Sequence, residues 1–381
     1  MSTTATPATS NSSSPTEDTP KPKRSFDFNQ VLVEGRALIA LALIIVVFSL
    51  MSDRYLTPDN LILMAKHVAM NAILALGMLV VILNGGIDLS VGSTVGLSGI
   101  VAGYLLQGMQ IPFSDMFAYP AAWVVMVLAL MVGALVGWIN GILVSRFKVA
   151  PFIATLGMLY VARGVAQLIS NGETFTRIFG EDGLGNTGFV SFLAGSQLGI
   201  PMPIWIMVVF AILFSILLTR TPFGRWLYAT GGNERAAELS GVPIKKVQVR
   251  IYVISGICAA MVGLLLTADL PGATPQAGLF YELNAIAAVV IGGAALSGGR
   301  GTVRGTIIGA FVIGFLVDGL VIVGVDYFWQ QVIRGAVIIL AVALDQLQQR
   351  MQAAGAVRRA KAGITKTPSG SSGGQPTAAQ A

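Results

Sequence analysis

Residues 120–144 read PAAWVVMVLALMVGALVGWINGILV, a run that contains no charged side chain. Crossing the hydrocarbon core of a bilayer takes about 20 apolar residues in an α-helix. The apolar residues of this run are continuous and lack the 3.6-residue or 2-residue period of a half-buried helix or strand, which indicates lipid as the solvent. Comparable runs recur along the chain. The sequence therefore predicts an all-α, polytopic membrane protein.

Composition agrees with this prediction. Hydrophobic residues make up 54% of the 381 residues and charged residues only 11%, which is about half or less of the usual charged share of a soluble domain. A water-soluble chain of this composition would need a core far larger than its surface could cover. The net charge of +6 could suggest nucleic acid, but its distribution along the chain fits membrane orientation better.

The apolar runs and the breaks between them predict about ten transmembrane helices. Helices are expected because backbone polar groups in lipid must be satisfied within the segment itself. The runs lie at 37–51, 61–83, 91–107, 120–144, 151–170, 203–219, 251–269, 283–299, 305–323 and 328–345.

The positive charges predict the orientation. With the N-terminus inside, the outer loops hold only Arg54 and Arg177, while Lys66, Arg163 and Arg334 lie within spans. Every other Lys and Arg of the 24 falls in a cytoplasmic segment. This asymmetry is what the positive-inside rule predicts for ten spans, and it places both termini in the cytoplasm.

The remaining segments predict the domain organisation. Residues 1–30 are rich in Ser, Thr and Pro and are expected to be a disordered tail, as are residues 348–381. The transmembrane domain then covers 31–347 and includes a long cytoplasmic loop, 220–250. The outer loop 171–202 carries an apolar patch from Phe189 to Leu193 that could lie at the membrane interface.

Several kinds of chemistry lack the residues they need. Cys258 is the only cysteine and His67 the only histidine, so no disulfide framework, metal site or histidine cluster is expected. No paired carboxylate site or Ser/His arrangement is visible, which leaves an intramembrane enzyme unsupported. The phosphate-binding pattern G-x-x-x-x-G-K-S/T is also absent, so the chain is not expected to bind ATP itself.

The break between the second and third spans is the first candidate functional feature. It reads Asn84-Gly85-Gly86-Ile87-Asp88-Leu89-Ser90-Val91-Gly92-Ser93. Two interpretations stay open. Asp88 could cap the third helix at the membrane edge, or the segment could be unwound and line a cavity, because irregular backbone at membrane depth is tolerated only under cover of protein or water. Asn84, Asp88 and Ser90 are therefore candidate translocation-pathway residues.

A similar pattern occurs in two places. Asn71-Ala72-Ile73 precedes Gly85-Gly86, and Asn284-Ala285-Ile286 precedes Gly292-Gly293. Glycine-interrupted segments in corresponding halves point to a translocation site, although chance or shared helix packing explains so few identities as well. Asn71 and Asn284 join the candidate pathway.

Charged residues inside the spans add a further candidate. Arg163 could face a polar pathway or extend to the outer surface, and Asp318 and Arg334 are intramembrane groups of the same kind. Of these, Arg163 is taken as a pathway residue.

Glycine spacing predicts helix packing. Gly133, Gly137 and Gly141 repeat every four residues, and so do Gly301, Gly305 and Gly309. Such faces let helices approach closely in a membrane.

The loop 220–250 contains a predicted short helix. Asn233 can cap a helix that begins at Glu234, and Gly241-Val242-Pro243 ends it. An Ala-rich face rimmed by charge suits docking into a groove on a soluble partner. The candidate contact residues are Asn233, Glu234, Ala236, Ala237, Leu239, Ser240 and Gly241.

Gly231–Gly241 resembles the E-A-A-type coupling loop of ABC importer permeases. The string G-G-I-D-L-S-V-G-S in 84–93 is similar to a motif of the ribose/xylose/galactose-type sugar permeases. Further matches are Ala154-Thr155-Leu156-Gly157 with Ala162-Arg163-Gly164, Tyr281–Gly293, and Leu296–Gly301. Together they cover roughly 35–347.

The resemblance implies a type II-like ABC importer permease of the bacterial inner membrane that works as a homodimer or pseudo-dimer. Its partners would be a cytoplasmic ATPase, which uses ATP and Mg²⁺ and contacts the helix at 233–240, and a periplasmic solute-binding protein, for which 171–202 is one candidate surface. The chain itself would bind no cofactor and no nucleic acid. Few Trp, Asn or Gln occur in the spans, so a passage with few polar features is expected. Alternatives are an importer of the same type for a nucleoside, a polyol or a branched-chain amino acid, and an ion-coupled secondary transporter.

Overall fold

The computed structural model describes residues 28–110, 116–176, 178–270, 272–340, 342–343 and 347. The chain divides into two compact units, Met1–Arg36 and Ala37–Ala381. The predicted tail 348–381 and residues 1–27 of the predicted tail 1–30 lie outside the described residues. All packing described below belongs to the second unit.

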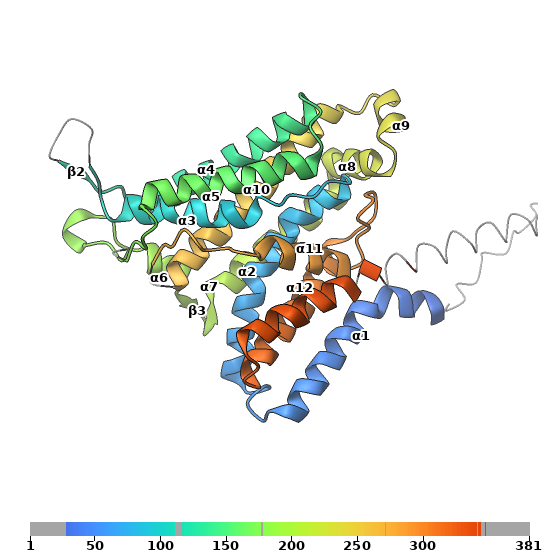
Figure 1. Cartoon of the computed structure of the whole chain (residues 1–381), viewed down its shortest axis with the longest axis horizontal. Helices are drawn as coiled ribbons and strands as arrows, with labels where there is room; N and C mark the ends of the chain where they lie inside the picture. Colours follow the sequence, from blue (N-terminus) through green and yellow to red (C-terminus); the bar gives the residue numbers. More distant parts are fainter. Residues whose placement is uncertain are drawn as a thin grey trace, which may run out of the picture. The chain divides into compact units, whose positions relative to one another are not determined.

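The structure is almost entirely helical (Figure 1). The α-helices are α1 (Phe28–Met51), α2 (Pro58–Leu83), α3 (Val91–Leu106), α4 (Ala122–Ser145), α5 (Pro151–Ser170), α6 (Phe189–Leu193), α7 (Met202–Arg220), α8 (Pro222–Gly232), α9 (Glu234–Leu239), α10 (Ile244–Asp269), α11 (Tyr281–Ile291) and α12 (Val303–Ile322). Residues 327–340 are also helical, and Asp182–Leu184 form a 3-10 turn. Strands β1 (Met109–Gln110) and β2 (Phe117–Ala118) form one small antiparallel hairpin, and β3 (Ser196–Gln197) and β4 (Ile200–Pro201) form another.

Six helices in the described part of the chain are long and apolar enough to cross a membrane, namely α2, α4, α5, α7, α10 and α12. Three shorter apolar helices, Ala37–Met51, α3 and α11, fall below that length. The prediction of a polytopic helical membrane protein is confirmed. Each of the ten predicted runs overlaps a helix, but ten crossings and the side of the termini stay predictions.

Three predicted boundaries are wrong. Helix α1 begins at Phe28 rather than at 37, so the last three residues of the predicted tail 1–30 are helical, and α10 begins at Ile244 rather than at 251. The third is an end. The run 283–299 was expected to be one helix, yet α11 ends at Ile291 and an irregular segment continues to Thr302. Gly293 has a φ of +91°, a conformation in which a right-handed helix cannot continue. An apolar run alone does not reveal this stop, because Ala294, Ala295 and Leu296 are as apolar as a span.

Helices α2 and α10 form the centre of the bundle. More than three quarters of the apolar stretch of each is buried, against a third or less for α4, α5 and α7. Helix α10 lies along α2, α3 and α4, while α2 also contacts α7, α11 and α12 (Figure 1). The outer helices expose large apolar side chains such as Trp123, Tyr160 and Leu168, as a lipid-facing or partner-facing surface requires.

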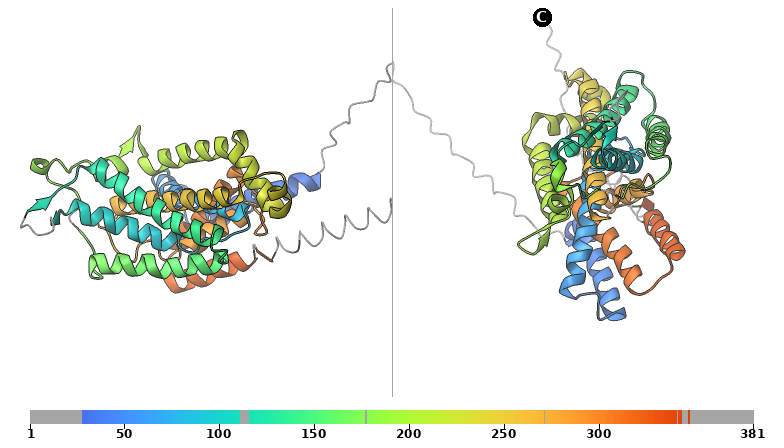
Figure 2. Two further views of the ribbon diagram at one scale, coloured as in Figure 1. Left: turned by 90° about the horizontal axis from the view of Figure 1, so that it is seen from above. Right: turned by 90° about the vertical axis from the view of Figure 1, so that its left-hand side faces the viewer.

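The two ends of this unit differ. Helices α8 and α9 lie at one end, and the hairpins β1–β2 and β3–β4 lie at the other, as the perpendicular views agree (Figures 1 and 2). The apolar patch Phe189–Leu193 near the second hairpin forms α6. Phe189 is fully enclosed and Leu193 is buried, so this patch packs into its own chain. Phe192 of the same helix is 52% exposed, and a position at the membrane interface stays a prediction.

Glycines bring α4 against α10. A Cβ atom on Gly133 or Gly137 would overlap the carbonyl of Gly256 or Tyr252, and one on Gly141 would overlap the Cα of Val249. Helix backbones this close gain dispersion contacts that larger residues would prevent.

The three glycines of the second repeat, Gly301, Gly305 and Gly309, do not all lie in one helix. Gly305 and Gly309 lie in α12 against the backbone of Gly292 and Ala288. Gly301 precedes the helix and contacts Ala294, so it does not belong to the same helical face.

We expect Gly137→Ala to force α4 away from α10 and to destabilise the protein by about 1–3 kcal/mol, the usual effect of overpacking. Gly157→Ala is the matched control, because nothing lies within 4 Å of a Cβ built on Gly157. Thermal unfolding of the purified protein in detergent measures both. Equal melting temperatures for the two variants would contradict the close contact.

Candidate functional site

The segment between α2 and α3 leaves helical geometry inside the protein. Gly85 has a φ of +79°, and the amide of Gly86 donates to the carbonyl of Val81 at 3.1 Å. The segment then follows α10, because a Cβ on Gly86 would touch the hydroxyl of Tyr252. Gly86, Asp88 and Ser90 of this irregular segment are buried by the surrounding protein, whereas Gly85 is exposed.

Asp88 holds this segment in place. Its carboxylate is 1% exposed and accepts hydrogen bonds from the backbone amide of Ser90 at 3.0 Å, the hydroxyl of Ser90 at 2.6 Å and the hydroxyl of Ser255 at 3.0 Å. The side-chain amide of Asn140 donates to the Ser90 hydroxyl at 2.9 Å. Asp88 therefore links the start of α3 to α10 and, through Ser90, to α4.

A second irregular segment, 272–280, follows α3 along its whole length. Ala273 lies against Gly103 in the last turn of α3, and Gly278 lies against Gly92 in the first turn. Arg163 of α5 holds the middle of the segment by donating from Nη1 to the carbonyls of Pro275 and Ala277. The interrupted helices α3 and α11 consequently begin beside each other, with Glu282 next to Gly92.

The end of α2, the end of α8 and the irregular segment before α12 meet in what we call the inner junction, formed by residues 83–86, 228–232 and 297–301. The amide of Gly299 donates to the carbonyl of Leu83 at 2.9 Å, and a Cβ on Gly231 would overlap that same carbonyl. The hydroxyl of Tyr228 donates to the carbonyl of Gly301 at 2.8 Å. Burial raises the pKa of Tyr228, so the phenol keeps the proton that this bond needs.

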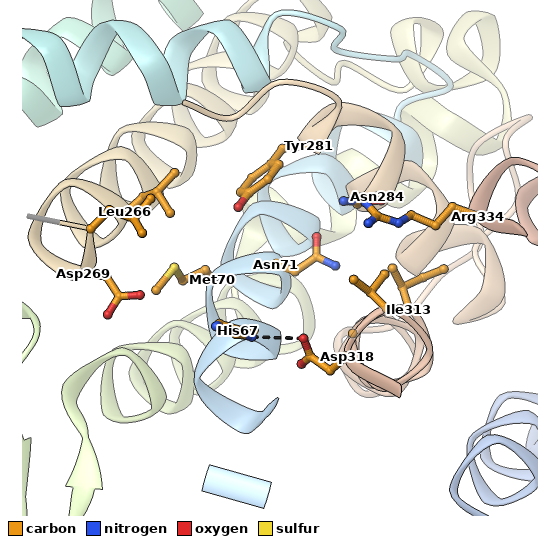
Figure 3. A pocket seen from close by; sticks show the side chains of 13 residues that line it. His67, Met70, Asn71, Leu266, Asp269, Tyr281, Asn284, Ile313, Asp318 and Arg334 are labelled. Atoms are coloured by element: carbon orange, nitrogen blue, oxygen red, sulfur yellow. Dashed lines mark hydrogen bonds and ion pairs between the residues drawn. The ribbon is translucent and has the colours of Figure 1, made fainter. Parts of the chain in front are cut away.

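A polar cavity of about 340 Å³ lies between α2, α10, α11, α12 and the helix 327–340 (Figure 3). Its lining combines apolar residues with seven side chains that are charged or can hydrogen-bond. The lining residues are His67, Met70, Asn71, Leu266, Asp269, Leu270, Tyr281, Asn284, Ile313, Gly314, Val317, Asp318 and Arg334.

Charged groups around the cavity are paired across helices. Nδ1 of His67 and Oδ1 of Asp318 are 3.1 Å apart, and Lys66 forms an ion pair with Asp269. Within its own helix, Arg334 donates from Nη2 to the side-chain oxygen of Gln330 at 3.2 Å. The cavity is rich in polar groups where the sequence predicted a passage with few.

The structure brings only some of the predicted pathway residues together. Asn71 and Asn284, which the repeated pattern paired, line the same cavity. Asn84, Asp88, Ser90 and Arg163 lie elsewhere and are not among its lining residues. For Asp88 the geometry agrees with the interpretation that it stabilises the start of α3.

Sequence reasoning missed most of the cavity. The sequence does identify Asp318 and Arg334 as ionisable residues inside spans, but it does not place them in a pathway. Tyr281, Asp269 and His67 carry no signal that separates them from helix-packing or interfacial residues. Their grouping depends on five helices that are distant in sequence.

The predicted short helix is present as α9. The side-chain oxygen of Asn233 accepts a hydrogen bond from the amide of Ala236 at 2.9 Å, which confirms the predicted cap. The helix ends before Ser240, and Gly241 has a φ of +83°. The longer helix α8 was missed, although the Thr221-Pro222 pair is an N-terminal signal and the Thr221 hydroxyl accepts from the amide of Gly224.

The exposed face of α9 differs from the predicted one. Ala237 is only 5% exposed, so it packs against its own chain and is not available to a partner. Glu234 and Ala236 are exposed, and Leu239 is 76% exposed. An Ala-rich sequence does not by itself show which alanine points inward.

The chain is similar to known transport proteins over nearly its whole length. A protein family described as "Branched-chain amino acid transport system / permease component" matches residues 60–342. The ribose import permease protein of Haemophilus influenzae is 40% identical over 322 residues, covering 84% of this chain and 95% of that protein. Its counterpart in Bacillus subtilis is 41% identical over 337 residues, covering 87% and 98%.

Relatives with lower sequence identity are named as permeases for other sugars. The galactose/methyl galactoside import permease protein of Escherichia coli K12 is 34% identical over 324 residues, covering 84% of this chain and 96% of that protein. No solved structure matches the chain.

The apolar spans and these relatives define a multi-pass membrane transport component rather than an enzyme. The chain belongs to the family described as the permease component of the branched-chain amino acid transport system. The predicted resemblance to the ribose- and galactose-type permeases is confirmed.

We expect Asp88→Asn to destabilise the protein by about 1–3 kcal/mol, because an amide has the same shape but leaves one of the Ser90 and Ser255 donors without an acceptor. Thermal unfolding of the purified variant measures this effect. The exposed variant Asp53→Asn is the control. A melting temperature like that of the wild type would show that the carboxylate does not stabilise the segment.

Proposed function

We propose that this chain is the membrane-spanning permease subunit of an ATP-driven, binding-protein-dependent importer that carries a sugar across the bacterial inner membrane. The observation that supports it most is the set of relatives named as ribose, D-allose and galactose permeases, which are 34–41% identical over most of the chain. A pentose or hexose is the solute class that these names share. ATP and Mg²⁺ are used by a partner ATPase.

The proposed topology has ten spans with both termini in the cytoplasm. It is supported by the helix found at each predicted run and by the position of the α8–α9 end opposite the two hairpins (Figure 2). The basic residues of 220–250 then lie in the cytoplasm, and 171–202 faces the periplasm as a candidate surface for the solute-binding protein.

The ATPase would dock on α9. Leu239 is an exposed apolar side chain beside the charged residues Glu234, Arg235 and Glu238, which suits a groove on a soluble protein. Asn233, Ser240 and Gly241 shape the two ends of the helix, and Ala236 adds a small exposed surface. Ala237 faces inward and would anchor α9 to its own chain.

The inner junction offers a route for the coupling. Helix α8 precedes α9 and contacts both irregular ends through Gly231 and Tyr228. A rigid-body displacement of α8 and α9 by the ATPase would therefore move the end of α2 and the irregular segment before α12 together. We further propose that two copies of the chain assemble with the ATPase, as the resemblance to homodimeric permeases implies.

A second candidate is an importer of the same type for another solute. The family description names branched-chain amino acids, and a nucleoside or polyol would also suit the fold. An ion-coupled secondary transporter is a third candidate.

Uptake by proteoliposomes that contain the chain, its ATPase and its binding protein distinguishes these candidates. We expect ATP-dependent uptake of labelled ribose, allose or galactose. Leucine uptake without sugar uptake would favour the second candidate. Uptake in vesicles without the ATPase, driven only by an ion gradient, would overturn the importer assignment.

We expect Leu239→Asp to weaken ATPase binding by about 2 kcal/mol or more, as for an anchoring residue, and to lower uptake tenfold or more. Co-purification of the ATPase with the tagged chain gives a direct readout. Leu198→Asp is a matched control for co-purification alone, because Leu198 is 92% exposed but lies at the hairpin end, in the candidate surface for the solute-binding protein. Retained co-purification and uptake in Leu239→Asp would exclude α9 as the docking helix.

A further inference from the structure

Three buried polar atoms around the cavity have no hydrogen-bond partner among the described residues. They are the side-chain oxygen of Asn71, Oδ2 of Asp318 and Nε of Arg334. Buried polar groups in folded proteins are paired in the large majority of cases. Eight such atoms occur in the described part of the chain, and three of them belong to side chains from three helices that line this one cavity. This grouping points to a ligand whose own polar groups satisfy them once the side chains turn toward the cavity.

Two of these side chains are held in position by their other atoms. Oδ1 of Asp318 is 3.1 Å from Nδ1 of His67, and Nη2 of Arg334 bonds to Gln330. Figure 3 shows Asn71, Asn284 and Arg334 converging on one region, with Asp318 at its lower edge. These bonds limit the motion of both side chains, which lowers the entropic cost of binding.

The atoms define the chemistry of the ligand. Asn71 and Asp318 each supply an acceptor, and Arg334 supplies a donor. A hydroxyl group both donates and accepts, so a molecule with several neighbouring hydroxyls can satisfy all three atoms. An anion would meet Asp318 and Asp269, and a cation would meet Arg334. This mixture of signs favours a neutral ligand.

Size restricts the ligand further. A volume of about 340 Å³ is near the lower limit of small-molecule sites, so the cavity suits a monosaccharide rather than a longer sugar. Asn71 lies near the midpoint of α2, which places the cavity well inside the spanning region.

We propose that this cavity is a binding site for a neutral monosaccharide within the permease, in which Asn71, Asp318 and Arg334 hydrogen-bond to sugar hydroxyls. Tyr281 and Asn284 form its wall. The sugar class rests on the proposed function. The zwitterion of an amino acid is the rival ligand, since its carboxylate could pair with Arg334 and its ammonium group with Asp318.

Direct binding to the purified full chain in lipid nanodiscs tests the site without the binding protein. Saturation-transfer NMR with D-ribose, D-galactose and L-leucine is the readout. We expect a sugar signal that falls fivefold or more in Asn71→Ala, Asp318→Asn and Arg334→Gln. The signal should persist in the exposed controls Gln167→Ala and Asp53→Asn. A leucine signal without a sugar signal, or sugar signals unaffected by the three variants, would overturn the proposal.

Binding of deoxy sugars distinguishes the loss of a direct hydrogen bond to the sugar from a loss of folding in the variants. For wild-type protein, removing the hydroxyl that faces Asn71 should weaken binding, and this difference should disappear in Asn71→Ala when its melting temperature is that of the wild type. A deoxy series with the same pattern in both proteins would contradict the contact. Uptake assays distinguish a failure of the proposed binding site from a failure of the proposed transport function. Normal sugar uptake by all three cavity variants would contradict the binding site but not the proposed function. Absence of sugar uptake by the wild-type importer would contradict the proposed function.

Discussion

Backbone amides and carbonyls inside a membrane protein must be hydrogen-bonded by the protein itself, and this constraint explains most of the architecture. A continuous helix satisfies them automatically. Where the chain leaves helical geometry, at 84–90 and 272–280, polar side chains of the segment itself and of neighbouring helices supply hydrogen bonds. Asp88 accepts from the amide of Ser90, Thr155 donates to the carbonyl of Ile87, and Arg163 donates to the carbonyls of Pro275 and Ala277. The charged residues that look most like transport machinery in the sequence thus serve the backbone.

Glycine residues allow neighbouring helix backbones to approach closely. Carbonyls and Cα atoms of one helix occupy the space that a Cβ would need at Gly133, Gly137 and Gly309, and the inner junction repeats this arrangement at Gly231. In lipid the hydrophobic effect does not drive helices together, so close packing has to supply the attraction. The places where backbones touch are therefore also the places where a displacement of one helix must displace its neighbour.

The sequence predicted those features that depend on local pattern. Apolar runs located the helices, and Asn233 located the start of α9. Asn71 and Asn284, which the repeated pattern pairs, line one cavity, and their place in a translocation pathway stays a prediction. The features that could not be predicted depend on tertiary packing. Residues as far apart as His67 and Asp318, 251 positions from each other, meet only through the packing of α2 against α12. Likewise, Gly301 continues a four-residue spacing but lies before the helix, and Ala237 differs from Ala236 only in the direction of its side chain.

The ion pairs beside the cavity have a consequence for biogenesis. Lys66 and His67 enter the membrane on α2, yet their partners Asp269 and Asp318 belong to α10 and α12, which the ribosome makes much later. An unpaired charge in an isolated span costs about 2.5–3.5 kcal/mol on insertion scales. Until α10 is made, Lys66 lacks the carboxylate with which it pairs in the complete structure, so we expect α2 to be less stable in the bilayer at that stage. Chain termination before α12 would likewise leave His67 without the carboxylate that lies 3.1 Å from it.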